Sequence, residues 1–237
     1  MSGTTDNFAI PFLLWLLVLL PAMSIVGFYR QKKAKIAIQK KKRYLAVIAF
    51  QLILLIITFE AASADRIHLF HSTPPSRTAC LVGLVILVTL VFSAQLSWKR
   101  LTEERKEQMR MLLPEVPSDL WYWTVISLFA GIGEECAYRG VAYTLLYWIF
   151  DSAVVGLIIS IVAFALMHSH QGWYGAVCAG ALGWIFQLMV FATGTLYLAI
   201  AVHAMYDVLI GVMFLRLLNN ENMTGTRLGE MERTPPS

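Results

Sequence analysis

The chain has 237 residues, of which 58% are hydrophobic and only 14% are charged. A soluble globular domain carries about 25% charged residues, so this composition excludes an ordinary soluble protein and is typical of an integral membrane protein. The net charge of +4 does not indicate a nucleic-acid partner, because most basic residues lie in two short runs beside apolar segments. We therefore expect the chain to be surrounded by membrane lipid and to bind no nucleic acid.

Several apolar runs are long enough to cross a bilayer, which takes about 20 residues of helix. Because every backbone polar group must find a partner inside the hydrocarbon layer, these runs are expected to be helices. The sequence therefore predicts an all-α protein, a polytopic transmembrane helix bundle. The runs lie at 8–29, 44–62, 78–98, 119–150, 151–168, 172–193 and 194–216.

The fourth run, 119–150, is too long for one straight crossing. As a continuous helix it would measure about 48 Å, well beyond the hydrocarbon core of about 30 Å. Gly131, Gly133 and Gly140 lie around its charged centre and make a kink or a break plausible. The bundle is therefore expected to contain seven or eight helices.

The basic residues predict the orientation. They are concentrated in the loops 30–43 and 98–118, whereas the loop 63–77 holds only Arg66 and Arg77. The positive-inside bias then places the two rich loops in the cytoplasm and the N-terminus outside. We expect the plasma membrane of a prokaryote, with the C-terminus in the cytoplasm.

We expect one membrane domain with three parts. Residues 1–118 would form three N-terminal transmembrane helices with basic cytoplasmic loops. Residues 119–216 would form a helical catalytic core, and residues 217–237, which are polar and contain Thr-Pro-Pro, a disordered cytoplasmic tail.

The centre of the fourth run carries Glu134, Glu135 and Arg139. One ionised residue at the centre of a membrane helix costs about 2.5–3.5 kcal/mol on insertion scales. Glu135 and Arg139 are four residues apart and can form an ion pair on one helix face. Glu134 lies about 100° away around the helix and needs a partner from elsewhere in the bundle.

The candidate partners are His168 and His170 near the end of the fifth run, and His203 and Asp207 on one face of the last. Carboxylates and imidazoles in this combination can activate water by taking its proton. They can equally bind a divalent metal through oxygen and nitrogen atoms.

Structural roles are alternatives for several of these residues. The pair of Glu135 and Arg139 can hold the site without reacting. Asp207 can simply fix the tautomer of the His203 ring. His170 lies next to Gln171 and Gly172 at a predicted turn, where we expect no catalytic role.

Three motifs resemble those of a known family. The stretch GEECAYRG at 133–140 matches an EExxxR signature, Phe164 to His168 matches FxxxH, and His203 to Asp207 matches HxxxN or HxxxD. In this order they resemble the CAAX-protease and bacteriocin-processing family, also called the Abi family, over residues 119–210. The resemblance implies an all-helical intramembrane endopeptidase with its site facing the cytoplasm.

The same resemblance implies roles for the catalytic residues. Glu134 and His168 would activate the attacking water, and Glu135 and Arg139 would shape the site. His203 and Asp207 would stabilise the oxyanion or bind metal. The implied metal set is Glu134, His168, His203 and Asp207, with a divalent ion such as zinc, although a metal-free reaction is equally compatible.

The third motif most often ends in Asn, so Asp207 is a departure from the family pattern. A carboxylate there repels an oxyanion but suits a metal ion or an imidazolium.

The expected substrate is a membrane-associated peptide or protein, including prenylated proteins of the CAAX type. The sequence leaves two other functions open, a proton- or ion-coupled transporter and a non-catalytic immunity or scaffold protein. It indicates neither the oligomeric state nor the identity of the substrate.

Overall fold

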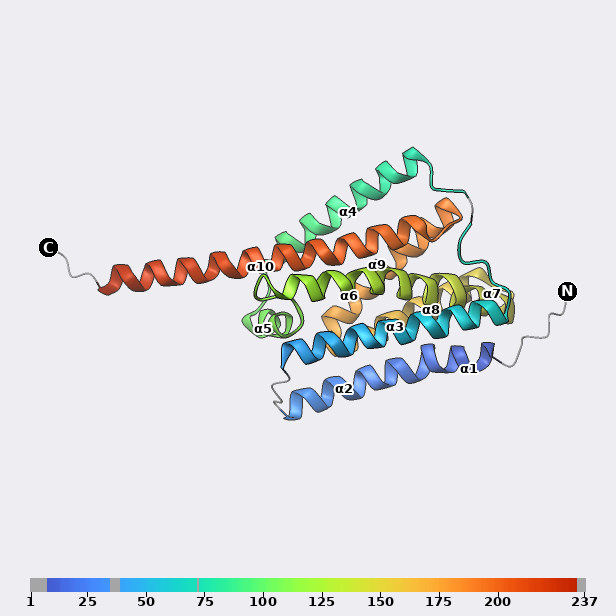
Figure 1. Ribbon diagram of the computed structural model, residues 1–237, viewed down its shortest axis with the longest axis horizontal. Coiled ribbons are helices and arrows are strands. Elements are labelled where there is room, and N and C mark those ends of the chain that lie inside the picture. Colours follow the sequence, from blue (N-terminus) through green and yellow to red (C-terminus); the bar gives the residue numbers. More distant parts are fainter. Residues whose placement is uncertain (1–7, 35–38, 72, 234–237) are drawn as a thin grey trace.

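The computed structural model describes residues 8–34, 39–71 and 73–233, with the backbone alone for 31–34 and 221–233. All regular structure in these ranges is helical, and the long helices run side by side as one bundle (Figure 1). The prediction of an all-helical fold is therefore confirmed.

The N-terminal half supplies three long helical segments. The first is continuous through α1 (Ala9–Leu14), the π-helical η1 (Trp15–Leu19) and α2 (Leu20–Ala34). It is followed by α3 (Lys40–Ala64) and, after a loop that crosses one end of the bundle, by α4 (Arg77–Trp98) (Figure 1).

The C-terminal half begins with a short polar helix and continues with the helices that hold the three motifs described above. The elements are α5 (Glu103–Leu112), α6 (Asp119–Glu134), η2 (Glu135–Ala142), α7 (Tyr143–Phe150), α8 (Ala153–Met167), η3 (His168–Gln171), α9 (Gly172–Thr193) and α10 (Tyr197–Arg233).

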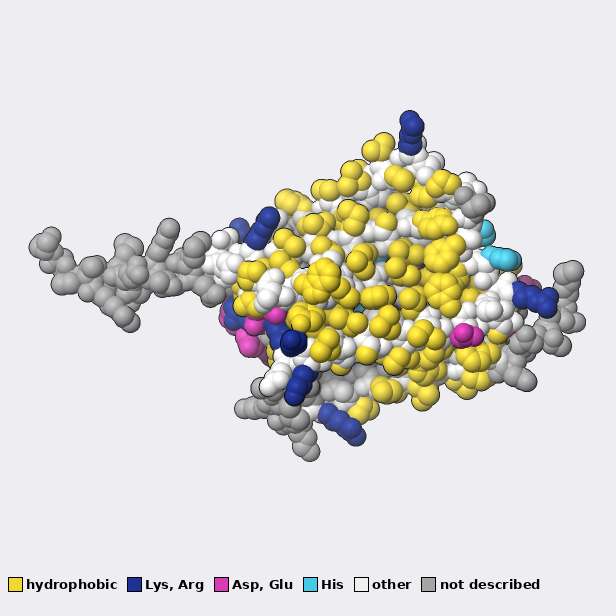
Figure 2. All heavy atoms as spheres, viewed as in Figure 1, with side chains coloured by type: hydrophobic (Ala, Val, Ile, Leu, Met, Phe, Trp, Pro, Cys, Tyr) yellow, Lys and Arg dark blue, Asp and Glu magenta, His cyan; other side chains and the backbone are white. Residues whose placement is uncertain are grey.

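The surface of the bundle is that of a multi-pass membrane protein. Apolar side chains cover its middle, and charged side chains gather toward its ends (Figure 2). Five helical segments of the described chain are long and apolar enough to cross a membrane. The 119–150 segment is not among the five, because its charged centre lowers its mean hydropathy. The total of seven or eight transmembrane helices therefore stays a prediction. The five are 9–30, 40–64, 77–98, 153–193 and 197–220.

The segment from Asp119 to Phe150 has no break, in contrast to the predicted alternative of two elements. α6 continues directly into η2, and η2 into α7. The charged stretch forms a π-helix over Glu135–Ala142, in which every residue is buried. Such wide turns inside α-helices occur frequently at functional sites.

The last helix is longer than predicted. The disordered tail was expected from residue 217, but α10 continues as helix to Arg233 and projects beyond the bundle (Figure 1). The extension contains no proline before Pro235, although its Asn, Thr and Gly residues have low helix propensity. The remaining residues, 234–237, lie outside the described part of the chain.

α6 lies between α3 and α10 and packs closely against both (Figure 1). Gly131 allows the approach to α10, because a Cβ atom there would lie 2.8 Å from the Ala204 Cβ and 3.0 Å from the Ala204 nitrogen and the Ile200 oxygen. Two of these three atoms belong to the backbone and cannot move independently. This contact sets the distance between the helices that carry Glu135 and His203.

We therefore expect Gly131→Ala to destabilise the protein by roughly 1–3 kcal/mol, as overpacking of a core contact does. Thermal unfolding in detergent measures the effect. Gly27→Ala on α2 is the matched control, because a Cβ atom there meets nothing within 4 Å and helix propensity favours alanine. Equal melting temperatures for the two variants would contradict the packing argument.

Candidate active site

Glu134 is buried at the junction of α6 and η2 and is held by a side chain from α3. Gln51 donates a hydrogen bond from its Nε2 to the Glu134 Oε1, with a length of 2.7 Å. The other carboxylate oxygen, Oε2, has no hydrogen-bond partner among the described residues. The amide therefore fixes the orientation of the carboxylate and leaves one oxygen free to act.

His168 lies where α8 ends and faces that free oxygen. Its Nδ1 is 2.8 Å from the Phe164 carbonyl oxygen, which can only accept, so Nδ1 carries the hydrogen. In the neutral ring Nε2 then holds a lone pair. Nε2 lies 3.8 Å from the Glu134 Oε2, which is beyond hydrogen-bond distance.

This arrangement brings together two acceptors, a carboxylate oxygen and an imidazole nitrogen. Two acceptors cannot bond to each other, but one water molecule can donate to both from within hydrogen-bond distance. His168 is partly exposed, at 14% of its side chain, while Glu134 is 5% exposed. The pair therefore has the geometry to polarise a water molecule at the edge of the buried region.

A second group forms around Glu135. His203 on α10 bonds through Nδ1 to the Glu135 Oε1 at 2.8 Å, and the Arg139 Nη1 lies 3.2 Å from the same oxygen. On the other side of the ring, the His203 Nε2 lies 3.6 Å from the Asp207 Oδ2. Glu135 therefore links a guanidinium and an imidazole, and His203 lies between two carboxylates.

Aromatic rings enclose this second group. The His203 ring stacks on Phe186 with 4.9 Å between centroids. The Arg139 guanidinium lies 4.1 Å from the Phe164 ring centre and fits there because position 183 is glycine, where a Cβ would meet the Arg139 Nη2 at 2.8 Å. Low-dielectric surroundings of this kind strengthen the ion pair.

His170 belongs to a different environment. Its Nδ1 is 3.1 Å from the Met167 carbonyl oxygen, and its backbone nitrogen donates to the Ser24 Oγ at 3.0 Å. It joins η3 to α2, which agrees with the structural role expected from the sequence.

The contacts divide the six predicted catalytic residues into two groups. One is Glu134 with His168, and the other is Glu135, Arg139, His203 and Asp207. The catalytic roles of these residues stay predictions.

The predicted metal set finds no support in these contacts. Glu134 and His168 supply only two donors, and both nitrogens of His203 face carboxylates. No group of three or more His, Cys, Asp or Glu side chains in the described ranges is arranged to hold a metal ion. The metal site therefore stays a prediction, and no step below depends on it.

Sequence reasoning missed two residues that organise the site. Gln51 orients Glu134, and Trp123 joins α6 to α10 by donating from its Nε1 to the Asp207 carbonyl oxygen at 2.7 Å. Gln51 had a detectable signal, because it is a lone amide in the apolar run FQLILLIITF, and a polar residue in a membrane span is a functional candidate. Trp123 had none, since an aromatic residue in such a run is ordinary.

The fold and the site together define a polytopic membrane protein with a buried carboxylate and histidine cluster. Residues 116–209 match the family model described as type II CAAX prenyl endopeptidase Rce1-like. This part of the chain contains all six residues, and the match agrees with the resemblance of its motifs to the CAAX-protease family. Neither the curated proteins nor the solved structures gave a significant match.

The bond between Gln51 and Glu134 makes a prediction that a double-mutant cycle tests. Gln51→Leu leaves a buried carboxylate without its donor, which we expect to cost about 1–3 kcal/mol of stability. In a Glu134→Leu background the same change should cost much less, because the partner is already gone. The readout is thermal unfolding in detergent, and equal costs in both backgrounds would show that the two side chains are not coupled.

Proposed function

We propose that the protein is an intramembrane endopeptidase that hydrolyses a peptide bond with a water molecule activated by Glu134 and His168. The observation that supports this most strongly is the 3.8 Å separation between the Glu134 Oε2 and the His168 Nε2. Both atoms are acceptors, and both are free on the side that faces the other. A scaffold protein gives no reason for two such acceptors to share one space.

In this proposal Glu134 takes a proton from the water, and the oxygen attacks the scissile carbonyl carbon. The proton then passes to the leaving amine as the carbon–nitrogen bond breaks, so the reaction consumes one water and returns the carboxylate to its starting state. Gln51 keeps the working oxygen aimed at the water, and the Nδ1–H bond to the Phe164 carbonyl keeps the His168 lone pair on Nε2.

His203 is the proposed partner of the oxyanion. Glu135 accepts the Nδ1 hydrogen, and a proton on Nε2 gives an imidazolium flanked by Glu135 and Asp207. The 3.6 Å distance from Nε2 to the Asp207 Oδ2 leaves that N–H free of a close bond to Asp207. Aspartate in place of the usual asparagine then serves to stabilise the cationic ring.

The substrate in this proposal is a membrane-associated protein or peptide, with prenylated CAAX-type proteins as the first class to test. This choice comes from the name of the matching family model. We further propose that the site is reached from the cytoplasm of a prokaryote, with the N-terminus outside, because the basic loops precede α3 and α6.

The catalytic assignment predicts a contrast between two neighbouring histidines. Glu134→Gln and His168→Ala should each lower the cleavage rate by about 10²–10⁴-fold, the usual contribution of general acid–base catalysis. His170→Ala is the matched control and should retain cleavage, because its contacts are to Ser24 and Met167. The assay uses purified protein in detergent with quenched fluorogenic peptides, including prenylated ones. Undiminished cleavage by both Glu134→Gln and His168→Ala would contradict the assignment.

The metal requirement is tested separately. Because both His203 nitrogens face carboxylates, we expect cleavage after prolonged chelation and dialysis to stay within about twofold of the untreated rate. A loss that added zinc restores would show that His203 or Asp207 rearranges around a metal ion. Elemental analysis of the purified protein is the control for incomplete removal.

A further inference from the structure

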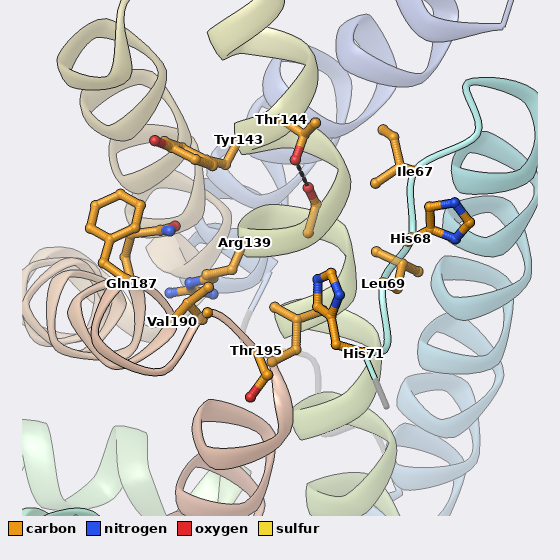
Figure 3. Close-up of a pocket in the computed structure, with 14 residues that line it drawn as sticks. Ile67, His68, Leu69, His71, Arg139, Tyr143, Thr144, Gln187, Val190 and Thr195 are labelled. Atoms are coloured by element: carbon orange, nitrogen blue, oxygen red, sulfur yellow. Dashed lines mark hydrogen bonds between the residues drawn. The ribbon is translucent and has the colours of Figure 1, made fainter. Parts of the chain in front are cut away.

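A second polar region includes Arg139 but not Glu135. It is a cavity of about 310 Å³ at the end of the bundle where the loop between α3 and α4 crosses. Figure 3 shows that its walls come from this loop, from η2, from the start of α7, from α9 and from the turn before α10, with Arg139 among them. We call this cavity the Arg139 pocket. Neither Glu134 nor His168 lines it, so it is distinct from the proposed water site.

Three buried polar side chains of the Arg139 pocket lack hydrogen-bond partners. Among the described residues, the Arg139 Nη2, the Gln187 Nε2 and the Thr195 Oγ1 have no hydrogen-bond partner, and the Arg139 Nη1 makes only the ion pair with Glu135. Their exposed fractions are 3%, 1% and 6%. Buried polar groups in native proteins are nearly always satisfied, so a cluster of unsatisfied ones around a cavity calls for a ligand.

All three side chains can donate hydrogen bonds, and the pocket lining contains no Asp or Glu. Guanidinium and amide donors around one space suit an anion, and arginine is the side chain best shaped for a carboxylate. Arg139 is the only Arg or Lys of the lining, and part of its charge is already balanced by Glu135 at 3.2 Å. A singly charged carboxylate therefore fits better than a doubly charged phosphate.

The rest of the pocket lining is apolar, which predicts that the rest of the ligand is apolar as well. This lining includes Ile67, Leu69, Val190, Phe191 and Leu196. The exposed His68 and His71 lie on the loop, where the pocket meets the surface. The ligand therefore combines one carboxylate with an apolar side chain.

We propose that the Arg139 pocket binds a small carboxylic acid with an apolar side chain, such as the C-terminal residue of a short peptide or a free acid of the same chemistry. The carboxylate accepts hydrogen bonds from Arg139, Gln187 and Thr195, and the apolar part packs against the wall. This proposal does not depend on proteolysis. Arg139 also forms an ion pair with Glu135, which bonds to His203. A ligand in the pocket is therefore linked to His203 through Arg139 and Glu135.

Binding of radiolabelled N-acetyl-leucine to the purified protein in detergent tests the proposal. N-acetyl-leucinamide, which has the same shape without the charge, should bind at least about tenfold more weakly, as the loss of charged hydrogen bonds requires. A leucine-terminated acetyl-tripeptide separates the two sources of the ligand. Tighter binding of the tripeptide supports a peptide terminus, and equal binding supports a free acid. Equal affinity for the acid and the amide would overturn the proposal.

Two threonines of the same pocket provide a matched pair of variants. Thr195→Val removes an unpartnered hydroxyl and should weaken N-acetyl-leucine binding by about tenfold. Thr144→Val should leave it unchanged, because the Thr144 Oγ1 already donates to the Gly140 carbonyl oxygen at 2.6 Å. Gln187→Glu should abolish binding by placing a carboxylate beside Arg139. Equal effects of the two threonine variants would contradict the role of Thr195, and unfolding curves identify any variant that fails to fold.

Discussion

An ionised side chain in the middle of a membrane helix must find its partners inside the bundle, and this constraint organises the centre of the protein. The α6–η2 segment brings Glu134, Glu135 and Arg139 into the apolar layer, and none of them is satisfied by its own helix alone. The partners come from other elements, with Gln51 on α3, His168 at the start of η3 and His203 on α10. The helices that surround the segment are thus held in register by polar contacts as well as by packing.

The two adjacent glutamates face different tasks because their surroundings differ. Glu135 is fully buried and engages a guanidinium and an imidazole, so its Oε1 is committed to holding charges in place. Glu134 has one oxygen held by an amide and one that faces only His168. A carboxylate that is oriented but not saturated has the properties of a general base, and this difference is the physical basis for assigning the reaction to Glu134.

Arg139 links the Glu135 group to the end of the bundle where the loop between α3 and α4 crosses. One side of its guanidinium contacts Glu135, and its nitrogens also border the cavity under the loop between α3 and α4. The π-helical turn over Glu135–Ala142 buries both residues on one short segment. A site for water and a site for a carboxylate can therefore be carried by neighbouring residues without sharing a cavity.

The sequence predicted much of the fold, because apolar length is a strong signal in a membrane protein. It also predicted that Glu135 and Arg139 can pair, and it limited the partners of Glu134 to His168, His170, His203 and Asp207, since few other polar residues occur in the spans. It did not predict the continuous helix through 119–150, because glycine permits a break without requiring one, and a π-helical stretch has no simple sequence signal. The helical extension of α10 was missed because its polar composition resembles that of a disordered tail. The Arg139 pocket depends on loop and helix ends that come together only in the folded bundle.

The central claim is that Glu134 and His168 act on one water molecule. The most direct test compares the cleavage rate of the Glu134→Gln/His168→Ala double variant with the rates of the two single variants. Residues that act as one unit give strongly non-additive losses. The double variant should therefore cleave no more slowly than the slower of the two single variants. A loss equal to the product of the two single losses would show that the residues act independently and would contradict the account.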